Sequence, residues 1–226
     1  MVKDSFTYPP SLGRNRKDQL YYLKGEKEPY TGPYEILDNH GQLLFKGHFK
    51  DGKNHGVYEE FENGEVCYRE TFSDGVLNGL NEVFDEQGKL ERRGYYLNGK
   101  KDGYWEDHVL PEDDGVVWKT NYKNGQRHGQ DECFVDGKCI RSSNFNYGYE
   151  HGLELSSYEN GQLEFVRCFT NGKRSGVWYF FDEEGNLVKK KFYDEKGNLE
   201  SIEAYKDGKR LYLKKIGRLF DPPPFC

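Results

Sequence analysis

The sequence predicts an all-β protein, an elongated single-layer antiparallel β-meander. Three observations support this fold class. A six-residue turn motif recurs along the chain, and a second turn signal stands between successive copies. Aromatic residues reach 16%, although hydrophobic residues make up only 35% and the mean hydropathy is −1.00. Large aromatic side chains can bury much area from few positions, so this composition favours a thin sheet over a thick two-layer core.

The turn motif sets the repeat length. It begins at residues 51–56 (DGKNHG), and its later copies occupy residues 74–79, 98–103, 124–129, 147–152 and 171–176. The closing glycines of these copies follow one another at intervals of 23 to 26 residues. A near-constant interval of this size indicates a repeat array in which each unit contacts its neighbours.

Each repeat is predicted to contain two strands. In the unit after Gly56, Asn63-Gly64 separates an alternating run at 57–62 from a second run at 66–73. Asn-Gly between such runs favours a type I′ hairpin, in which both central residues have positive φ. Successive strands joined by short turns pair antiparallel.

The second strand of each repeat predicts one aromatic face. An aromatic residue stands two positions before each turn, and the alternate positions are mostly polar. Residues separated by an even number lie on the same face of a strand. The residues of this row are Phe49, Phe72, Tyr96, Tyr122, Phe145, Phe169 and Tyr205.

Three segments are expected along the chain. Residues 1–19 lack the repeat and are expected to form an irregular arm, and residues 20–212 form the array of about seven units. Residues 213–226 are expected to provide a C-terminal cap, either a last strand or a short helix, and a Pro-rich tail. A terminal repeat lacks an outer neighbour, so a cap is needed there.

The composition also bears on partners and compartment. The formal net charge is −6, whereas nucleic-acid binding needs a basic face. The five cysteines are spread along the chain without metal-ligand spacing, which is typical of reduced thiols. No apolar run is long enough to span a membrane. We therefore expect a cytoplasmic protein, or a periplasmic or envelope protein if a leader precedes this sequence.

No constellation for catalysis or for a cofactor stands out. His55, His128 and His151 occupy the same repeat position, but equivalent residues one unit apart are separated by about 9–10 Å, too far to share a metal. Cys133 and Cys139 flank a turn, with Phe134 expected opposite Cys139 and Cys133 opposite Ile140, so their sulfurs should point to opposite faces. We expect no enzyme activity, no metal and no cofactor.

The residues of the repeat resemble those of a known family. The segments 158–163 (YENGQL) and 171–176 (NGKRSG) look like the MORN-repeat variant found in bacterial proteins, and the resemblance covers about residues 20–212. The start of the array, at 20–32, is similar to that of members described as antitoxins or immunity proteins. The resemblance implies a non-catalytic antitoxin that neutralises a cognate protein toxin by binding it. Other MORN proteins are scaffolds or bind membrane surfaces, and this alternative stays open.

A row of glutamates suggests where a partner could bind. Three residues after each opening glycine stands a glutamate, in five consecutive units: Glu35, Glu59, Glu82, Glu106 and Glu132. Counting through the hairpins places this row on the aromatic face, with Tyr58, Trp105 and Trp118 nearby. An acidic, aromatic groove suits a partner with a basic contact surface. The plainer interpretation is cross-strand pairing, for example Glu82 with Arg92 and Glu132 with Arg141.

Two further surfaces are candidates for contacts. The expanded turn at 110–115 contains Glu112, Asp113 and Asp114, which form either an acidic contact loop or a solvated loop. Exposed sheet edges could pair two copies of the chain edge to edge. The net charge speaks against binding to anionic lipid, although the basic cluster at 209–218 could act locally.

Overall fold

The computed structural model describes residues 6–9, 11–109 and 115–216, and every regular element within them is a β-strand. The chain divides into two compact units, and the boundary falls within β12 (Val116–Lys123). Unit 1 comprises the described residues up to 109 together with 121–126, and unit 2 comprises 115–120 and 127–216. In each unit consecutive strands pair antiparallel, so the predicted all-β meander is confirmed. No helix in the described part is long and apolar enough to cross a membrane.

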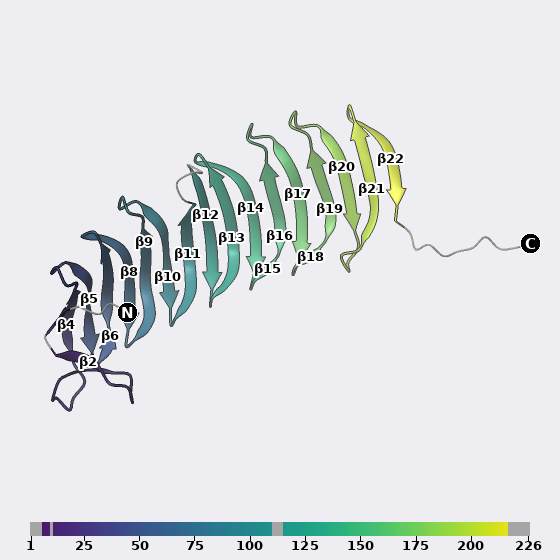
Figure 1. Ribbon diagram of the computed structural model, residues 1–226. Helices are drawn as coiled ribbons and strands as arrows, with labels where there is room; N and C mark the ends of the chain where they lie inside the picture. The colour runs from purple at the N-terminus through teal and green to yellow at the C-terminus, as the bar shows by residue number, and fades with distance from the viewer. Residues whose placement is uncertain (1–5, 10, 110–114, 217–226) are drawn as a thin grey trace, which may run out of the picture. The chain divides into compact units, whose positions relative to one another are not determined.

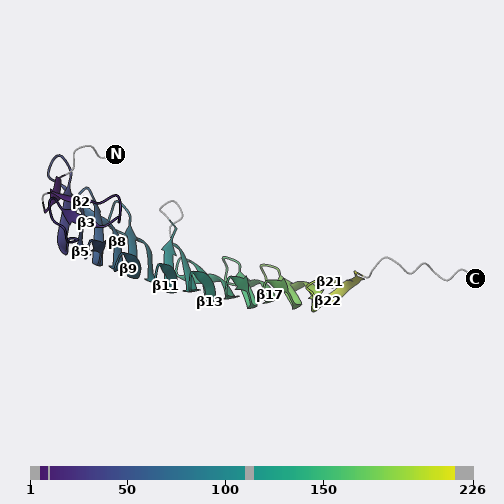
Figure 2. The same ribbon diagram turned by 90° about the horizontal axis from the view of Figure 1, so that it is seen from below.

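Unit 1 is a single layer of consecutive strands with a small hairpin beside its first strands (Figures 1 and 2). Short connections join each strand to the next, and the small hairpin consists of β2 and β3. The strands are β1 (Phe6–Tyr8), β2 (Leu12–Arg14), β3 (Tyr21–Leu23), β4 (Gly32–Leu37), β5 (Leu43–Lys50), β6 (Lys53–Asn54), β7 (Gly56–Glu62), β8 (Glu65–Ser73), β9 (Val76–Phe84), β10 (Leu90–Leu97) and β11 (Lys100–His108).

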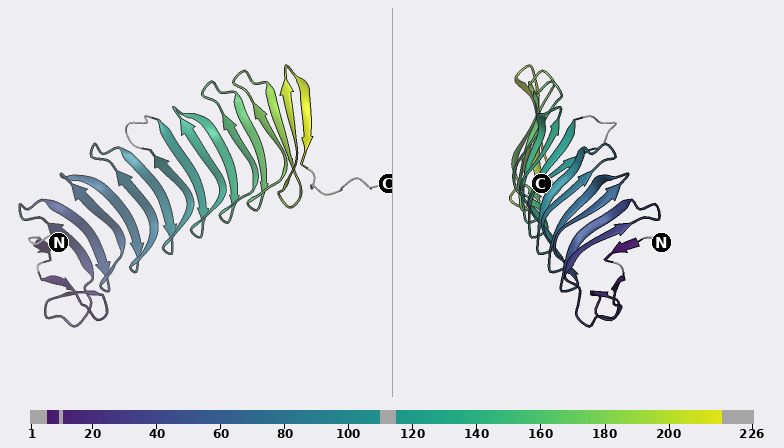
Figure 3. Two further views of the ribbon diagram at one scale, coloured as in Figure 1. Left: turned by 45° about the vertical axis from the view of Figure 1, so that its right-hand side comes forward. Right: turned by 90° about the vertical axis from the view of Figure 1, so that its left-hand side faces the viewer.

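Unit 2 repeats the same pattern, and Figure 3 shows its strands in teal to yellow from two sides. Its small core is the cluster of Phe169, Trp178 and Tyr193, with Phe180 and Leu199 packed against it. The strands are β13 (Gln126–Val135), β14 (Lys138–Asn146), β15 (Tyr149–Glu150), β16 (Gly152–Ser157), β17 (Leu163–Thr170), β18 (Lys173–Arg174), β19 (Gly176–Phe181), β20 (Leu187–Tyr193), β21 (Leu199–Lys206) and β22 (Lys209–Lys215).

The two-residue turns have the predicted backbone conformation. In the turn between β7 and β8, φ is 52° at Asn63 and 86° at Gly64. The turn between β8 and β9 has 50° at Asp74 and 84° at Gly75. Two successive positive φ values define a type I′ turn, whose twist matches that of the flanking strands. The type I′ prediction is therefore confirmed.

A one-residue bulge interrupts the ladder beyond these turns. Between β7 and β8, Phe61 pairs with Val66, but Glu60 pairs with Tyr68, so Cys67 is an extra residue in the returning strand. The same one-residue shift occurs in the hairpins β4–β5, β9–β10, β13–β14, β16–β17, β19–β20, β20–β21 and β21–β22. A shift of one residue moves every later side chain to the other face of its partner strand.

The bulge corrects one predicted pairing. Phe134 pairs with Cys139 as expected, but Cys133 pairs with Arg141 and not with Ile140, because Ile140 is the extra residue of this hairpin. Cys133 is buried and Cys139 is exposed, and both are free thiols.

The opposite ends of the strands contain a second irregularity at the closing glycine. Phe49 pairs with Asn54, whereas Phe45 pairs with Glu60, so two extra residues lie on the outgoing strand. His55 sits in this interruption, and its backbone N–H donates to the carbonyl of His48 at 2.8 Å. Gly56 follows with φ at 79°, a conformation that favours glycine.

The residue before the closing glycine connects neighbouring repeats. The Nδ1 atom of His55 lies 3.4 Å from the backbone N of Asp74, which begins the next turn. His128 and His151 make the same contact with the backbone N atoms of Tyr147 and Asn171. The three histidines therefore accept backbone hydrogen bonds at an equivalent place in each repeat. This structural role agrees with their interpretation as turn residues.

The N-terminal arm differs from the expected irregular segment. Its described residues contain β1 and β2. β1 pairs antiparallel with the outer edge of β4, with Tyr8 opposite Glu35. Unpaired N–H and C=O groups at a sheet edge favour such an added strand. Residues 1–19 lack the repeat, so the sequence pattern did not indicate this pairing.

The C-terminal segment continues the array further than expected. β22 extends the last hairpin to Lys215, so the expected cap at 213 begins as a strand and not as a helix. The rest of the expected Pro-rich tail, at 217–226, lies outside the described residues. The predicted acidic loop of Glu112, Asp113 and Asp114 also lies outside them.

Close packing in unit 1 gives a test of the sheet geometry. A Cβ atom added at Gly94 would lie 2.1 Å from Cδ2 of Trp105, whereas one added at Gly13 would have no atom within 4 Å. We therefore expect Gly94→Ala to lower the free energy of unfolding by about 1–3 kcal/mol through overpacking. Gly13→Ala is the matched control and should change it by less than about 0.5 kcal/mol. Urea titration followed by tryptophan fluorescence measures both, and equal midpoints would contradict this packing.

Candidate functional site

Two faces of unit 1 have different chemistry. The aromatic face contains Tyr34, Phe45, Phe49, Tyr58 and Phe72, which line one cavity. The charged face is the opposite one, and it contains Glu59, Arg69, Glu82 and Arg93, which are joined by ion pairs.

The glutamate row lies on the charged face, which corrects the sequence-based prediction. Without a bulge, Glu59 would face Tyr68 and would share its side of the sheet. With the extra residue in β8, Glu59 pairs with Arg69 instead. Tyr58, the neighbour of Glu59 in the chain, lines the aromatic cavity, and adjacent residues of a strand point to opposite faces. The counting across the hairpin was therefore wrong by one residue.

Cations compensate the two most buried members of the row. Glu59 contacts Lys46 at 2.7 Å and Arg69 at 2.8 Å. Glu82 accepts from Arg69 at 2.8 Å and from Arg93 at 2.9 Å. Glu59 and Glu82 are only 9% and 4% exposed. Burial favours a higher pKa for Glu59, but the hydrogen bonds from Lys46 and Arg69 outweigh it and lower the pKa below its usual value.

The cross-strand partners of Glu82 and Glu132 also differ from those expected from the sequence, which were Arg92 and Arg141. Glu82 contacts Arg93 rather than Arg92, and Arg92 pairs with Asp107. Glu132 lies opposite Ser142 in the ladder, while Arg141 bonds Glu154 at 2.6 Å. The bulges explain both changes, because each moves the partner by one residue. The interpretation of the row as cross-strand pairs holds for Glu59 and Glu82.

The three remaining glutamates of the row differ in their neighbours and in their exposure. Glu35 is exposed in β4 and lies opposite Lys46. The Oε1 atom of Glu106 lies 3.2 Å from Nε2 of His108. Glu132 is half-buried. Within unit 1, the row is thus interleaved with basic side chains and does not form an open acidic groove.

The three aromatic residues predicted at the site are in different environments. Trp105 is 0% exposed, its Nε1 donates to the carbonyl of Tyr95 at 3.1 Å, and Lys101 lies 3.9 Å from its ring centroid. Trp105 therefore stabilises the sheet and is not accessible to a partner. Trp118 lines a separate cavity in unit 2. Only Tyr58 lies in the aromatic cavity of unit 1.

The cavity in unit 2 is lined by ion-paired side chains and by one further acid. It has a volume of about 470 Å³, and Arg127, Asp131 and Arg141 line it together with Trp118. Arg127 contacts Asp131 at 3.3 Å, and Arg141 contacts the buried Glu154. The arginines are thus engaged by acids of the same unit, whereas Glu150, which also lines this cavity, forms no ion pair within the described residues.

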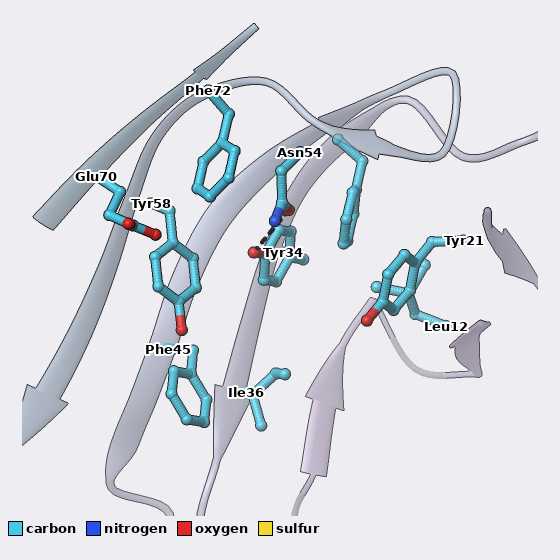
Figure 4. A pocket seen from close by; sticks show the side chains of 10 residues that line it. Leu12, Tyr21, Tyr34, Ile36, Phe45, Asn54, Tyr58, Glu70 and Phe72 are labelled. Carbon is cyan, nitrogen blue, oxygen red and sulfur yellow. Dashed lines mark hydrogen bonds between the residues drawn. The ribbon is translucent and has the colours of Figure 1, made fainter. Parts of the chain in front are cut away.

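The aromatic cavity of unit 1 has a volume of about 410 Å³, and Figure 4 shows side chains that line it. Its floor is a stack of three rings: Tyr21 lies 4.3 Å from Phe49, and Tyr34 lies 4.2 Å from Phe49, centroid to centroid. Phe45 and Phe72 flank Tyr58 at centroid distances of 6.1 and 6.3 Å. These rings form the aromatic walls of the cavity.

One carboxylate stands at the wall of this cavity, and the sequence analysis missed it. Glu70 is half-buried, and Figure 4 shows its side chain beside Tyr58. Its Oε1 accepts from the hydroxyl of Tyr68 at 2.6 Å and from Nδ2 of Asn81 at 3.5 Å. No Lys, Arg or His in the described part of the chain forms an ion pair with it. Glu70 stands two residues from both Tyr68 and Phe72, so strand alternation alone could have identified it.

Burial and nearby acids favour the neutral form of Tyr58 and of its neighbour Tyr68. Burial raises the pKa of Tyr58, with further contributions from the charges of Glu60 and Glu70. Burial and the hydrogen bond to Glu70 raise the pKa of Tyr68 to about 12. Glu60 faces Phe45 and Tyr68 in the ladder and likewise has no ion pair within the described residues. The cavity thus combines aromatic rings with one lining carboxylate, Glu70, that has no ion pair within the described residues.

Comparison with known protein families adds to this geometry. Residues 77–100 in unit 1, and residues 150–171 and 174–193 in unit 2, match the MORN repeat variant. These matches support the MORN-repeat family. No curated protein matches the chain. The MORN repeats indicate a repeat scaffold or binding module.

The described residues show no grouping suited to a metal. Among these residues no set of three or more His, Cys, Asp or Glu side chains could hold a metal ion. The histidines of the repeats are occupied instead by the backbone contacts between neighbouring turns.

The ion pairs of the charged face in unit 1 yield a second prediction. Arg69→Ala should lower the free energy of unfolding by about 2 kcal/mol, because two buried carboxylates lose a charged hydrogen-bond donor. The matched control is Lys50→Ala, since Lys50 pairs with Asp74 at 3.5 Å and both side chains are well exposed. Lys50→Ala should change the free energy of unfolding by less than about 1 kcal/mol. If chemical denaturation shows equal effects, Glu59 and Glu82 do not depend on Arg69.

Proposed function

We propose that this chain is a non-catalytic protein-binding module whose aromatic cavity in unit 1 accepts a basic side chain of a partner protein. The observation that carries the proposal is the half-buried Glu70 without a cation at the wall of an aromatic cavity. The repeats support the general class, a scaffold or binding module.

The chemistry of the cavity suits a guanidinium or ammonium group. Aromatic faces attract cations, with a contribution of about 0.5–2 kcal/mol that grows as water is excluded. A carboxylate beside the rings adds a charge-assisted hydrogen bond, which is stronger than a neutral one. Phe45, Tyr58 and Phe72 supply the rings, and Glu70 supplies the charge. An acidic ligand would be repelled by Glu60 and Glu70.

The charged face offers less to such a partner. A cation approaching Glu59 or Glu82 would have to replace Lys46, Arg69 or Arg93, which already neutralise these acids. Breaking one buried pair to form another yields little net affinity. The aromatic face is therefore the better docking surface in unit 1.

The identity of the partner rests on the resemblance noted in the sequence. We propose that the partner is a protein toxin with a basic contact surface, and that binding neutralises the toxin by occlusion. The net charge of −6 supports this choice, because opposite charges steer association.

Two variants test the cavity against a partner obtained from the native organism. A single stoichiometric partner, encoded beside this chain and toxic when expressed alone, is expected. Glu70→Gln and Tyr58→Ala should each weaken its binding at least about tenfold, which corresponds to about 1.4 kcal/mol. The matched control is Glu65→Gln, an exposed acid of the same strand, which should leave the affinity within about threefold.

Calorimetry of the purified complex measures these affinities, and circular dichroism confirms that each variant is folded. Unchanged affinity in both cavity variants would contradict the assignment of the site. A partner without toxicity, bound through the cavity, would retain the binding function and refute the antitoxin role.

A further inference from the structure

The outer edge of β22 is a second surface that the aromatic cavity does not explain. β22 pairs with β21 on one side, and no described strand pairs with it on the other (Figure 1). All seven of its residues are exposed. In unit 1, by contrast, β1 from the same chain covers the outer edge of β4.

The backbone of β22 presents hydrogen-bonding groups outward at known positions. The N–H of Ile216 donates to the carbonyl of Glu200 at 2.7 Å. Bonded and non-bonded residues alternate along an antiparallel ladder, so Lys214 and Tyr212 also point their backbone groups toward β21. The N–H and C=O groups of Leu213 and Lys215 therefore point away from the sheet, where an added strand could bond them.

Apolar side chains accompany this open edge. Tyr212 is 55% exposed and Leu213 is 42% exposed, and Leu211 and Ile216 are similarly open. A run of exposed apolar residues on a strand with unpaired backbone groups is a site for strand addition.

The charge pattern selects the kind of strand. Arg210 is engaged by Glu203 at 2.7 Å, but no described acid forms an ion pair with Lys209, Lys214 or Lys215. In an antiparallel pair of two β22 strands centred on Tyr212, Lys209 would face Lys215 and Arg210 would face Lys214. Like charges directly opposite each other are destabilising. This register of an edge-to-edge homodimer is therefore disfavoured, and the lysines without an ion pair favour an acidic strand.

We propose that the outer edge of β22 binds an extended, acidic segment of another protein by antiparallel β-strand addition. The backbone of Leu213 and Lys215 supplies the ladder hydrogen bonds, the lysines pair with acidic side chains of the segment, and Leu213 contributes apolar contact.

The probe is a fluorescent heptapeptide of alternating Glu and Val, compared with its counterpart of alternating Lys and Val. Anisotropy titration of the full chain should show binding of the acidic peptide at least tenfold tighter than that of the basic one. Amide NMR shifts on addition of the acidic peptide should be largest at Leu213 and Lys215. Equal affinity of the two peptides, or no detectable binding of either, overturns the proposal.

Two variants at one position separate backbone pairing from side-chain contact. Leu213→Pro removes an outward N–H without removing a bond to β21, since proline is tolerated at such edge positions. It should weaken binding of the acidic peptide at least tenfold. Leu213→Thr keeps the N–H and should stay within threefold, and circular dichroism checks the fold of both variants.

Unchanged binding in Leu213→Pro overturns the proposal. Analytical ultracentrifugation supplies the competing outcome: a concentration-dependent dimer that Leu213→Pro abolishes would show that a second copy, and not an acidic segment, occupies this edge. The cavity variant Glu70→Gln should leave peptide binding at β22 unchanged, which separates this site from the aromatic cavity.

Discussion

The one-residue bulge of β7–β8, which recurs in seven other hairpins, is the constraint on which both faces of the sheet depend. In β7–β8 the extra Cys67 shifts the pairing so that Glu59 meets Arg69 and not Tyr68. Because strand side chains alternate, this single insertion places the buried glutamates with the arginines and leaves the rings of Tyr58 and Phe72 on the other side. A sheet without the bulge would bury carboxylates among aromatic rings, where they would lack cationic partners and would cost free energy.

Separation of charge from aromatic surface explains how a thin sheet can be stable and still bind. On the charged face of unit 1, Arg69 bridges Glu59 and Glu82 across neighbouring strands. On the aromatic face, Tyr34 and Phe49 are buried, and the rings of Tyr21 and Tyr34 both stack on Phe49. The rings nearer the surface and Glu70 are left available. In this account, stability and binding are assigned to opposite faces of the same strands.

The sequence was sufficient for the repeat, the turns and the meander, because each depends on local chemistry. Asn63-Gly64 specifies its own backbone conformation, and the interval between glycines specifies the unit. The face of the glutamates could not be obtained by counting, since no residue type marks Cys67 as the bulged position. Glu70 was missed although alternation with Tyr68 and Phe72 places it on the aromatic face, and Trp105 was placed at a contact surface although it is 0% exposed, because burial within the sheet is not visible in the sequence. The strand β1 was missed because its pairing depends on a distant edge.

The register of β7–β8 is the central claim, and engineered disulfides test it most directly. In a chain with Cys67 replaced by serine, the double variants Glu59→Cys/Arg69→Cys and Glu59→Cys/Tyr68→Cys can be oxidised and mapped by mass spectrometry. Cross-strand partners lie within the Cα separation of about 4.4–6.8 Å that a disulfide requires. The bulged register predicts a bridge between 59 and 69 and none between 59 and 68. A bridge between 59 and 68 alone would return the glutamates to the aromatic face and contradict the account.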